Sequence, residues 1–270
     1  MPARSVLAAL LVALGPAAAA QGAPAQDVAP SRLDTVLARG ELRVGITPSV
    51  PWVMVRDDGG IVGFDVDLAE RLADSLGVRA AYVVVSADSL LAGVERGRYD
   101  VALGGLIVTP DRLRRVGMTR PYSITRVSLL PRADRDTLAS MAVADREGVA
   151  LGVVSGSSAV RVLDVAVRRA EVRAYPGELA LFVALRDGEV DAAVVYDEQA
   201  AIARRAFPDV VADRAFSIAL GGEATAYPRG DGRFGAALDR VIGSLRRSGW
   251  LDERRAYWFD PEGLRARTEG

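Results

Sequence analysis

The chain has 270 residues, of which 50% are hydrophobic and 26% are charged, and its formal net charge is −1. This balance is typical of a globular protein of one or two domains and lacks the basic excess of a nucleic-acid-binding face. The absence of cysteine, histidine and lysine excludes catalytic triads, thiolate nucleophiles, pyridoxal Schiff bases and thiolate or imidazole metal sites. Carboxylate chemistry remains possible, but the composition favours binding, so we expect no metal, no cofactor and no catalytic residue.

The N-terminus has the pattern of a cleavable export signal. Arg4 precedes an apolar run from Val6 to Leu14 that is too short to span a bilayer, and Ala18–Ala20 supply the small residues of a cleavage site. The alternative, a buried N-terminal helix, is disfavoured because Gly15-Pro16 would break it. Residues 1–20 are therefore a predicted signal peptide. No cysteine follows the run, so we expect a periplasmic protein without a lipid anchor.

Strands and helices alternate in the first half of the mature chain. Residues 21–36 are an expected flexible leader, rich in Ala and Pro at first and running into a short helix. The expected elements are a helix over Leu33–Ala38, a strand over Leu42–Ile46, a loop over Thr47–Val53, a helix from Asp65 to Leu76, a strand over Val78–Val85, a helix over Asp88–Arg96 and a strand over Asp100–Leu103. This β-α-β-α-β order predicts a parallel sheet wrapped by helices, with ligands bound beyond the carboxyl ends of its strands.

The stretch from Gly104 to Arg112 carries the strongest local signal for a binding site. Thr109 is a suitable helix N-cap, and Pro110 suits the first helical position. Arg112 then lies in the first turn, where unpaired N–H groups and the positive end of the helix dipole favour an anion. The glycines allow a ligand to approach the backbone closely. The residues predict a carboxylate site, although Arg112 could also simply pair with a surface acid such as Asp111.

The same plan recurs in the second half of the chain. The expected elements are a strand over Val149–Val154, a helix beginning at Val160, a strand over Glu171–Tyr175, a helix over Glu178–Arg186, a strand ending at Tyr196 and a helix through Phe207. Ser155-Gly156-Ser157-Ser158 supplies capping hydroxyls at a second anion-binding helix start. Asp197 follows a strand end and is either a binding carboxylate or a helix cap.

Two extended stretches connect the halves. Arg126–Arg132 leads out of the first half, and Phe216–Pro228 leads back to a C-terminal helix over Asp231–Ser248. Two crossings between two lobes predict a hinge with a ligand trap between them. The predicted boundaries are 37–127 plus 219–260 for lobe 1, 128–218 for lobe 2 and 261–270 for a C-terminal tail.

Together these segments resemble the periplasmic solute-binding proteins of polar amino-acid ABC importers, extracellular solute-binding family 3, which are related to ionotropic glutamate receptor ligand-binding domains. The resemblance covers about Leu37 to Phe259. The motifs that carry it are Leu42-Arg43-Val44-Gly45, Gly63-Phe64-Asp65-Val66-Asp67-Leu68-Ala69, Thr109-Pro110-Asp111-Arg112, Pro121-Tyr122, Gly156-Ser157-Ser158, Val190-Asp191-Ala192 with Asp197, Gly249-Trp250-Leu251 and Tyr257-Trp258-Phe259. It implies a two-lobed α/β fold, each lobe a mostly parallel sheet wrapped by helices.

The resemblance also implies roles for individual residues in binding an amino acid. Arg112 would hold the α-carboxylate with backbone groups at Gly105 and Ile107. Ser157 and Ser158 would add donors from the second lobe, and Asp197 would pair with the ammonium. Closure of the lobes would desolvate both charge pairs and strengthen them.

The sequence departs from the family pattern where aromatic residues usually sandwich the ligand. Those positions are Ser49 and Ala87 here, Trp52 is the aromatic residue left in that loop, and Ile107 replaces a common hydroxyl. The departures predict a wider pocket and weaker binding of the ligand carboxylate. The expected ligand is an amino acid or another small carboxylate.

Three functions follow from the resemblance. We expect the substrate-binding component of an ABC importer, a monomer that binds no nucleic acid and delivers its ligand to an inner-membrane permease. The enzyme alternative is an exported prephenate or arogenate dehydratase, for which Glu178, Glu198 and Glu223 are available acids. The third possibility is a ligand sensor that acts through a separate membrane receptor.

Overall fold

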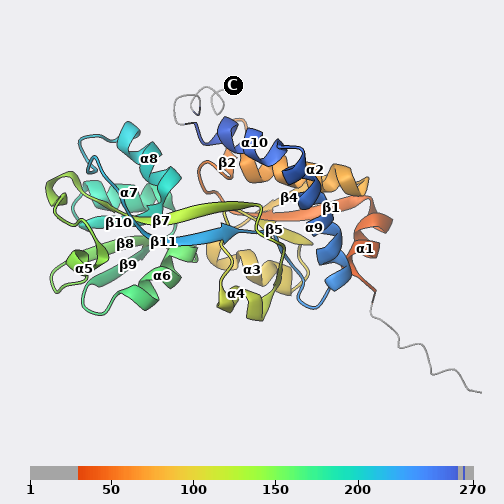
Figure 1. Ribbon diagram of the computed structural model, residues 1–270, viewed down its shortest axis with the longest axis horizontal. Coiled ribbons are helices and arrows are strands. Elements are labelled where there is room, and N and C mark those ends of the chain that lie inside the picture. Colours follow the sequence, from red (N-terminus) through yellow and green to blue (C-terminus); the bar gives the residue numbers. More distant parts are fainter. Residues whose placement is uncertain (1–29, 261–263, 265–270) are drawn as a thin grey trace, which may run out of the picture.

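The computed structural model describes residues 30–260 and residue 264. The predicted signal peptide, residues 21–29 of the predicted leader and the predicted tail apart from Leu264 lie outside the described residues. The described chain forms two lobes that lie end to end and are joined by two long strands (Figure 1). The predicted α/β fold of two lobes is confirmed.

Lobe 1 contains both ends of the described chain. Its elements are α1 (Arg32–Arg39), β1 (Glu41–Ile46), β2 (Met54–Val55), β3 (Ile61–Val62), α2 (Phe64–Leu76), β4 (Arg79–Val84), α3 (Ala87–Glu95), β5 (Val101–Leu103), α4 (Pro110–Arg115), β6 (Gly117–Met118), β12 (Ala226–Tyr227), α9 (Gly232–Arg247) and α10 (Trp250–Trp258). Its sheet has the order β4-β1-β5-β12-β6, in which β4, β1 and β5 are parallel and β12 is antiparallel to both of its neighbours.

Lobe 2 repeats this arrangement. Its elements are β7 (Ser123–Pro131), a 3-10 turn (Ala133–Arg135), α5 (Met141–Ala144), β8 (Ala150–Val154), α6 (Ser158–Ala166), β9 (Glu171–Tyr175), α7 (Glu178–Arg186), β10 (Ala192–Tyr196), α8 (Asp197–Ala206) and β11 (Phe216–Glu223). The sheet order is β9-β8-β10-β7-β11, with β9, β8 and β10 parallel and β7 and β11 antiparallel to their neighbours. In both lobes the carboxyl ends of the parallel strands therefore lead into the loops that face the other lobe.

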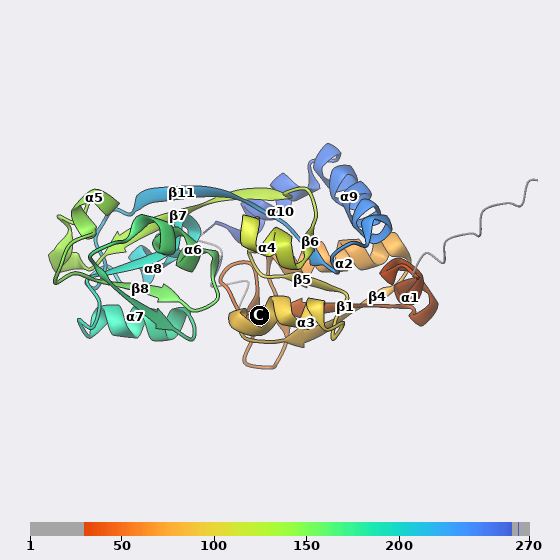
Figure 2. The same cartoon turned by 90° about the horizontal axis from the view of Figure 1, so that it is seen from below.

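The crossing strands β7 and β11 run side by side from one lobe to the other (Figure 2). They pair in an antiparallel ladder from Phe216 opposite Leu129 to Glu223 opposite Ser123. These strands correspond to the two extended stretches predicted from the sequence. The predicted lobe boundaries at 127 and 219 fall inside the strands, which continue as edge strands of the second sheet.

Helix α2 shows how the sequence sets the core of lobe 1. Phe64, Leu68 and Leu72 recur every four residues and are fully buried, as expected for the apolar face of a helix packed on a sheet. The helix begins after Gly63, where φ is +137° and a Cβ atom would lie 2.3 Å from the Trp52 carbonyl oxygen. Glycine is therefore required at this close approach.

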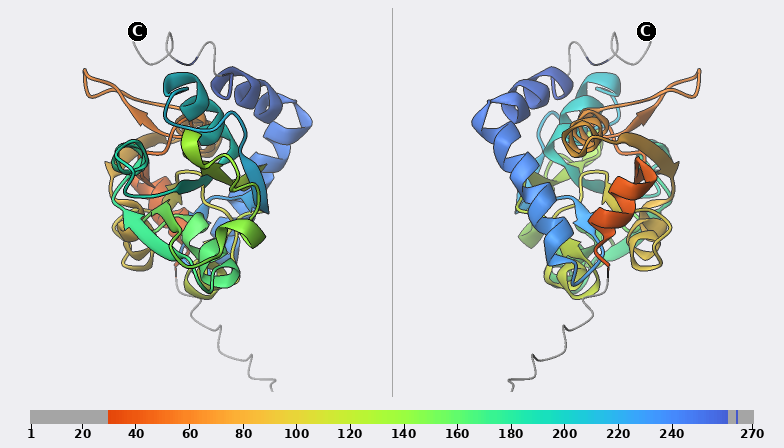
Figure 3. Two further views of the ribbon diagram at one scale, coloured as in Figure 1. Left: turned by 90° about the vertical axis from the view of Figure 1, so that its left-hand side faces the viewer. Right: turned by 90° about the vertical axis from the view of Figure 1, so that its right-hand side faces the viewer.

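The helix predicted over Leu33–Ala38 is present, so the leader predicted for residues 21–36 extends too far from residue 32 onward. Helix α1 begins at Arg32, is capped by Ser31, and buries Leu33 and Val36. It packs beside α9, as the end view of lobe 1 shows (Figure 3). The burial of two aliphatic side chains fixes this segment to the lobe.

Candidate ligand-binding site between the lobes

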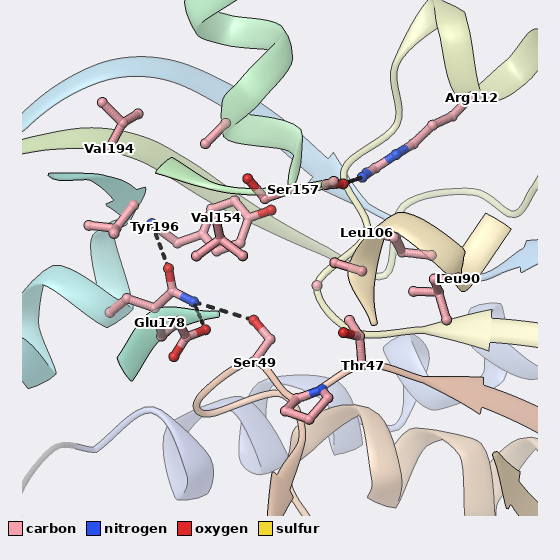
Figure 4. A pocket seen from close by; sticks show the side chains of 18 residues that line it. Thr47, Ser49, Leu90, Leu106, Arg112, Val154, Ser157, Glu178, Val194 and Tyr196 are labelled. Carbon is pink, nitrogen blue, oxygen red and sulfur yellow. Dashed lines mark hydrogen bonds between the residues drawn. The ribbon is translucent and has the colours of Figure 1, made fainter. Parts of the chain in front are cut away.

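A pocket lies between the lobes, with an empty volume, open mouth included, of about 510 Å³. Loops and helix starts at the carboxyl ends of strands from both sheets line it (Figure 4). The lining residues are Thr47, Pro48, Ser49, Ala87, Leu90, Gly104, Gly105, Leu106, Arg112, Val154, Gly156, Ser157, Ala159, Glu178, Val194, Val195, Tyr196 and Gln199.

Arg112 is the cationic group of the pocket. Thr109 caps α4 by accepting the Arg112 backbone N–H at 3.3 Å, as the sequence predicted. The side chain is 8% exposed, and its Nη1 donates to the Ile107 carbonyl at 2.7 Å and to the Ser158 hydroxyl at 2.5 Å. Burial lowers its pKa. No ion pair found among the described residues includes Arg112. Its buried guanidinium is therefore available to pair with a bound anion.

Serine hydroxyls from lobe 2 lie at the same end of the pocket. Ser157 is the N-cap residue of α6, and its hydroxyl is buried without a partner among the described residues. Ser158 follows at the first helical position and accepts the bond from Arg112. Burial raises the pKa of the neighbouring Tyr196, while the charge of Arg112 and hydrogen bonding from Ser158 lower it. Polar groups of both lobes thus converge at this end.

Two predicted partners of a ligand carboxylate are already engaged within lobe 1. Gly105 lines the pocket, but its N–H donates to Asp65 Oδ2 at 2.8 Å, and the Gly104 N–H donates to the same oxygen at 2.7 Å. The Ile107 carbonyl holds Arg112, and its side chain lies outside the pocket lining. Asp65 is fully buried, and burial raises its pKa to about 6. These groups position the glycine loop and Arg112.

Trp52 and Asp197, two of the predicted ligand contacts, lie outside the pocket lining. Trp52 is fully buried and packs edge-on against Tyr196 and Phe259, with ring centroids 5.2 and 5.1 Å apart. Asp197, the first residue of α8, accepts a hydrogen bond from the Ser128 hydroxyl. Neither side chain lines the pocket, so Trp52 supports its wall from behind and Asp197 is turned towards a crossing strand.

A carboxyl group that was not among the predicted ligand contacts lies at the opposite end. Glu178, the first residue of α7, lines the pocket and accepts the Val50 N–H at 3.4 Å and a hydrogen bond from the Gln199 side-chain amide. Burial raises its pKa to about 7. Ser49, which was predicted, accepts from the same amide at 3.3 Å. A sequence signal existed, since Glu178 lies in the first turn of the helix that follows β9, as Arg112 lies in the first turn of the helix that follows β5.

The other two acids considered for catalysis lie outside this pocket. Glu223 is fully buried at the end of β11, and burial together with Asp65 raises its pKa to about 8. Arg255 of α10 lies 3.7 Å from Glu223 and donates to Glu198 and, at 2.7 Å, to Ser123. This cluster links α10 to the crossing strands and to lobe 2 and is separate from the pocket lining.

Contacts across the mouth of the pocket hold the lobes together. The Ser155 hydroxyl donates to Asp88 at 2.7 Å, and Arg161 Nε lies 3.4 Å from Asp111 Oδ2. With the Arg112–Ser158 bond, they define a closed arrangement. Within the described ranges, no three histidine, cysteine or acidic side chains gather as a metal site, and no helix has the length and apolar character needed to cross a membrane.

The sequence model of the bacterial extracellular solute-binding proteins, family 3, matches residues 42–261. The chain belongs to this family. A family 3 fold explains why two similar sheets face one pocket, and the resemblance predicted from the motifs is confirmed.

Individual relatives include both an enzyme and binding proteins. Cyclohexadienyl dehydratase of Pseudomonas aeruginosa is 29% identical over 238 residues, which cover 85% of this chain and 87% of that protein. An L-cystine-binding protein of Escherichia coli is 28% identical over 235 residues, covering 84% and 85%. An arginine-bound substrate-binding protein of Streptococcus pneumoniae has a TM-score of 0.77 and 26% identity over 84% of this chain and 98% of that one. Membership of family 3 supports a solute-binding role, and the relatives include binding proteins as well as an enzyme.

Proposed function

We propose that this family 3 protein is the substrate-binding component of an ABC importer. It captures a small amino acid or a related carboxylate between its lobes and delivers it to an inner-membrane permease. It acts as a monomer in the periplasm after removal of residues 1–20. The family supports the solute-binding role, and relatives named as amino-acid-binding proteins support this ligand class.

The observation that carries the proposal is the buried guanidinium of Arg112 in the interlobe pocket. A cation removed from water needs a counter-charge, and none of the described ion pairs supplies one. The hydroxyl of Ser157, which has no partner in the part of the chain that the structure describes, adds a donor beside it. A carboxylate accepts from both groups, and lobe closure shields the pair from water.

The test combines ligand identification with one substitution. A thermal-shift screen of amino acids and small carboxylates, with mass spectrometry of any co-purified molecule, identifies the ligand. Arg112→Ala should then weaken its binding in calorimetry by about 2–5 kcal/mol while the fold is retained. Arg79→Ala is the matched control, because Arg79 is 75% exposed and pairs with Glu41 at the surface. Unchanged affinity in Arg112→Ala would refute the assignment.

The relative from Pseudomonas aeruginosa and the raised pKa of Glu178 favour a dehydratase-like enzyme as the second candidate. An acid with a pKa of about 7 can donate a proton to a leaving hydroxyl group at neutral pH. Incubation of the protein with prephenate or arogenate separates the candidates. Conversion of the added prephenate or arogenate that is lost in Glu178→Gln would establish the enzyme. Recovery of the added compound unchanged after a long incubation would support transport.

A further inference from the structure

The pocket has chemically opposite ends. Figure 4 shows Arg112 and Glu178 on opposite sides of the space between the lobes. Arg112 bonds to Ile107, Ser158 and Gly156, and Glu178 bonds to Val50 and Gln199, so the two charged groups share no partner in these contacts. One end therefore presents donors to an anion, and the other presents a carboxyl group.

The hydrogen bonds of Gln199 determine which end of its side-chain amide faces Glu178. Its Oε1 accepts the Tyr196 N–H at 3.0 Å, so its Nε2 faces Glu178 and the Ser49 hydroxyl, 3.3 Å away. Val50 supplies a further N–H at 3.4 Å. These neutral donors only partly satisfy a carboxylate, which can accept about four hydrogen bonds. A cationic group of a ligand would complete this site.

Aliphatic side chains also line the pocket. Leu90 and Leu106 come from lobe 1, and Val154 and Val194 come from lobe 2. Such walls suit a short methylene chain. Asp197, which the family resemblance assigns to an α-ammonium, faces Ser128 outside the pocket lining.

We propose that the ligand is an ω-cationic carboxylate, whose carboxylate pairs with Arg112 and whose terminal ammonium or guanidinium pairs with Glu178. This inference rests on the proposed solute-binding function and names its ligand class. The distance between the charged ends, bridged by methylene groups, provides the selectivity, and an α-ammonium is not required.

The protonation state of Glu178 provides a second test, because a ligand that only packs in the pocket would not change it. Burial raises its pKa to about 7, and the groups that face it from the first loop of lobe 1 and from α8, namely Ser49, Val50 and Gln199, carry no charge. A bound cation favours the ionised carboxylate. Binding of an ω-cationic ligand near pH 7 therefore releases a proton, whereas a neutral ligand does not.

Calorimetry with three probes tests the proposal. They are 5-aminovalerate, which has the terminal cation; pentanoate, which lacks it; and norvaline, whose ammonium is at the α-carbon. Wild type should bind 5-aminovalerate about tenfold or more tighter than the other two. Titration at pH 7 in two buffers of different ionisation enthalpy should show proton release with 5-aminovalerate only.

Glu178→Gln should abolish the preference and the proton release while changing pentanoate affinity less than about threefold. Glu171→Gln is the matched control, since Glu171 is an exposed residue of the same lobe that pairs with Arg173. Circular dichroism checks that each variant is folded. Loss of preference in the control, an unchanged preference in Glu178→Gln, or tighter binding of norvaline by wild type would overturn the inference.

The outcomes also separate this inference from the proposed function. Probes that bind through Arg112, with no discrimination by the terminal charge, would leave the solute-binding function standing and reject the ligand class. If neither the probes nor the carboxylates of the thermal-shift screen bind, or if Arg112→Ala leaves their affinity unchanged, the proposed function itself fails.

Discussion

Lobe 1 and lobe 2 each place a charged side chain at the start of a helix beside the pocket, but they hold it differently. Within lobe 1, Thr109 caps the Arg112 backbone and the Ile107 carbonyl accepts from its guanidinium, while the other guanidinium bonds go to Ser158 and Gly156 of lobe 2. Glu178 receives one of its bonds from Val50 of the other lobe, and Gln199 of its own lobe also reaches across to Ser49.

This difference suggests an order of events in binding. When the lobes separate, Arg112 keeps its bonds to Thr109 and Ile107 and loses those to Ser158 and Gly156. The guanidinium therefore stays in place on lobe 1 and can receive a carboxylate in an open protein. The Glu178 end is completed only when the first loop of lobe 1 meets α7 and α8. Lobe 1 is therefore the preorganised half of the site, and lobe 2 contacts the rest of the ligand only after the lobes close.

The largest effect is expected from the residue that organises the lobe 1 end. Asp65→Ala leaves the N–H groups of Gly104 and Gly105 and the hydroxyl of Tyr122 without their acceptor. Unsatisfied buried groups should lower the free energy of unfolding by about 3 kcal/mol, measured by urea denaturation. Asp74→Ala, at an exposed position of the same helix, serves as control. A loss no larger than in the control would show that Asp65 does not organise the loop.

The lobe 2 end should respond to pH, whereas Arg112 keeps its charge over the same range. Folding raises the pKa of Glu178 from 4.5 to about 7, so the folded protein keeps a proton that the unfolded chain loses. Stability contributed by this proton is therefore lost as the pH rises across that window, by about 1–3 kcal/mol.

Urea denaturation from pH 4.5 to 7 in wild type and Glu178→Gln measures this contribution. Glu223 and Asp65 also have raised pKa values, to about 8 and about 6, and both proteins share their effect. The difference between the two curves therefore isolates Glu178, and parallel curves would contradict its burial in the closed protein.

A smaller effect is expected from Ser157→Ala. The hydroxyl is buried without a partner among the described residues, so its removal should leave the stability of the empty protein unchanged or slightly higher. Loss of a donor to the ligand carboxylate should weaken binding by about 1 kcal/mol in calorimetry. Equal affinity in the variant and wild type would mean that lobe 2 adds nothing through this residue to the Arg112 end.

The smallest effect is expected from Asp197→Asn. Because this carboxylate accepts from Ser128 and does not line the pocket, the variant should bind within about twofold of wild type, since it contacts no part of the ligand. The family resemblance predicts the opposite, a large loss for ligands with an α-ammonium. Calorimetry with norvaline and pentanoate decides between them, and a loss confined to norvaline would restore Asp197 to the site.

Local signals in the sequence were sufficient for the order of elements and for one end of the site. Thr109 and Pro110 mark the start of α4 through capping and backbone preference, which depend on neighbouring residues only. The same reasoning placed a helix start just after the serines of 155–158, and the structure has Ser157 as the N-cap residue of α6. It also found the helix over Leu33–Ala38, but it did not show that this helix belongs to lobe 1, because the helix packs against α9, which lies far away in the chain.

The sequence by itself therefore determined two α/β halves, two crossings and a basic helix start that faces a ligand. Only the tertiary structure decided which polar groups remain free for that ligand. Asp65 occupies the N–H of Gly105, Ser128 engages Asp197, and Glu178 meets Val50, 128 positions away in the chain. The physical reason is that a hydrogen-bonding group can be satisfied by any partner that folding brings near, and such long-range pairings leave no periodic or local trace in the sequence.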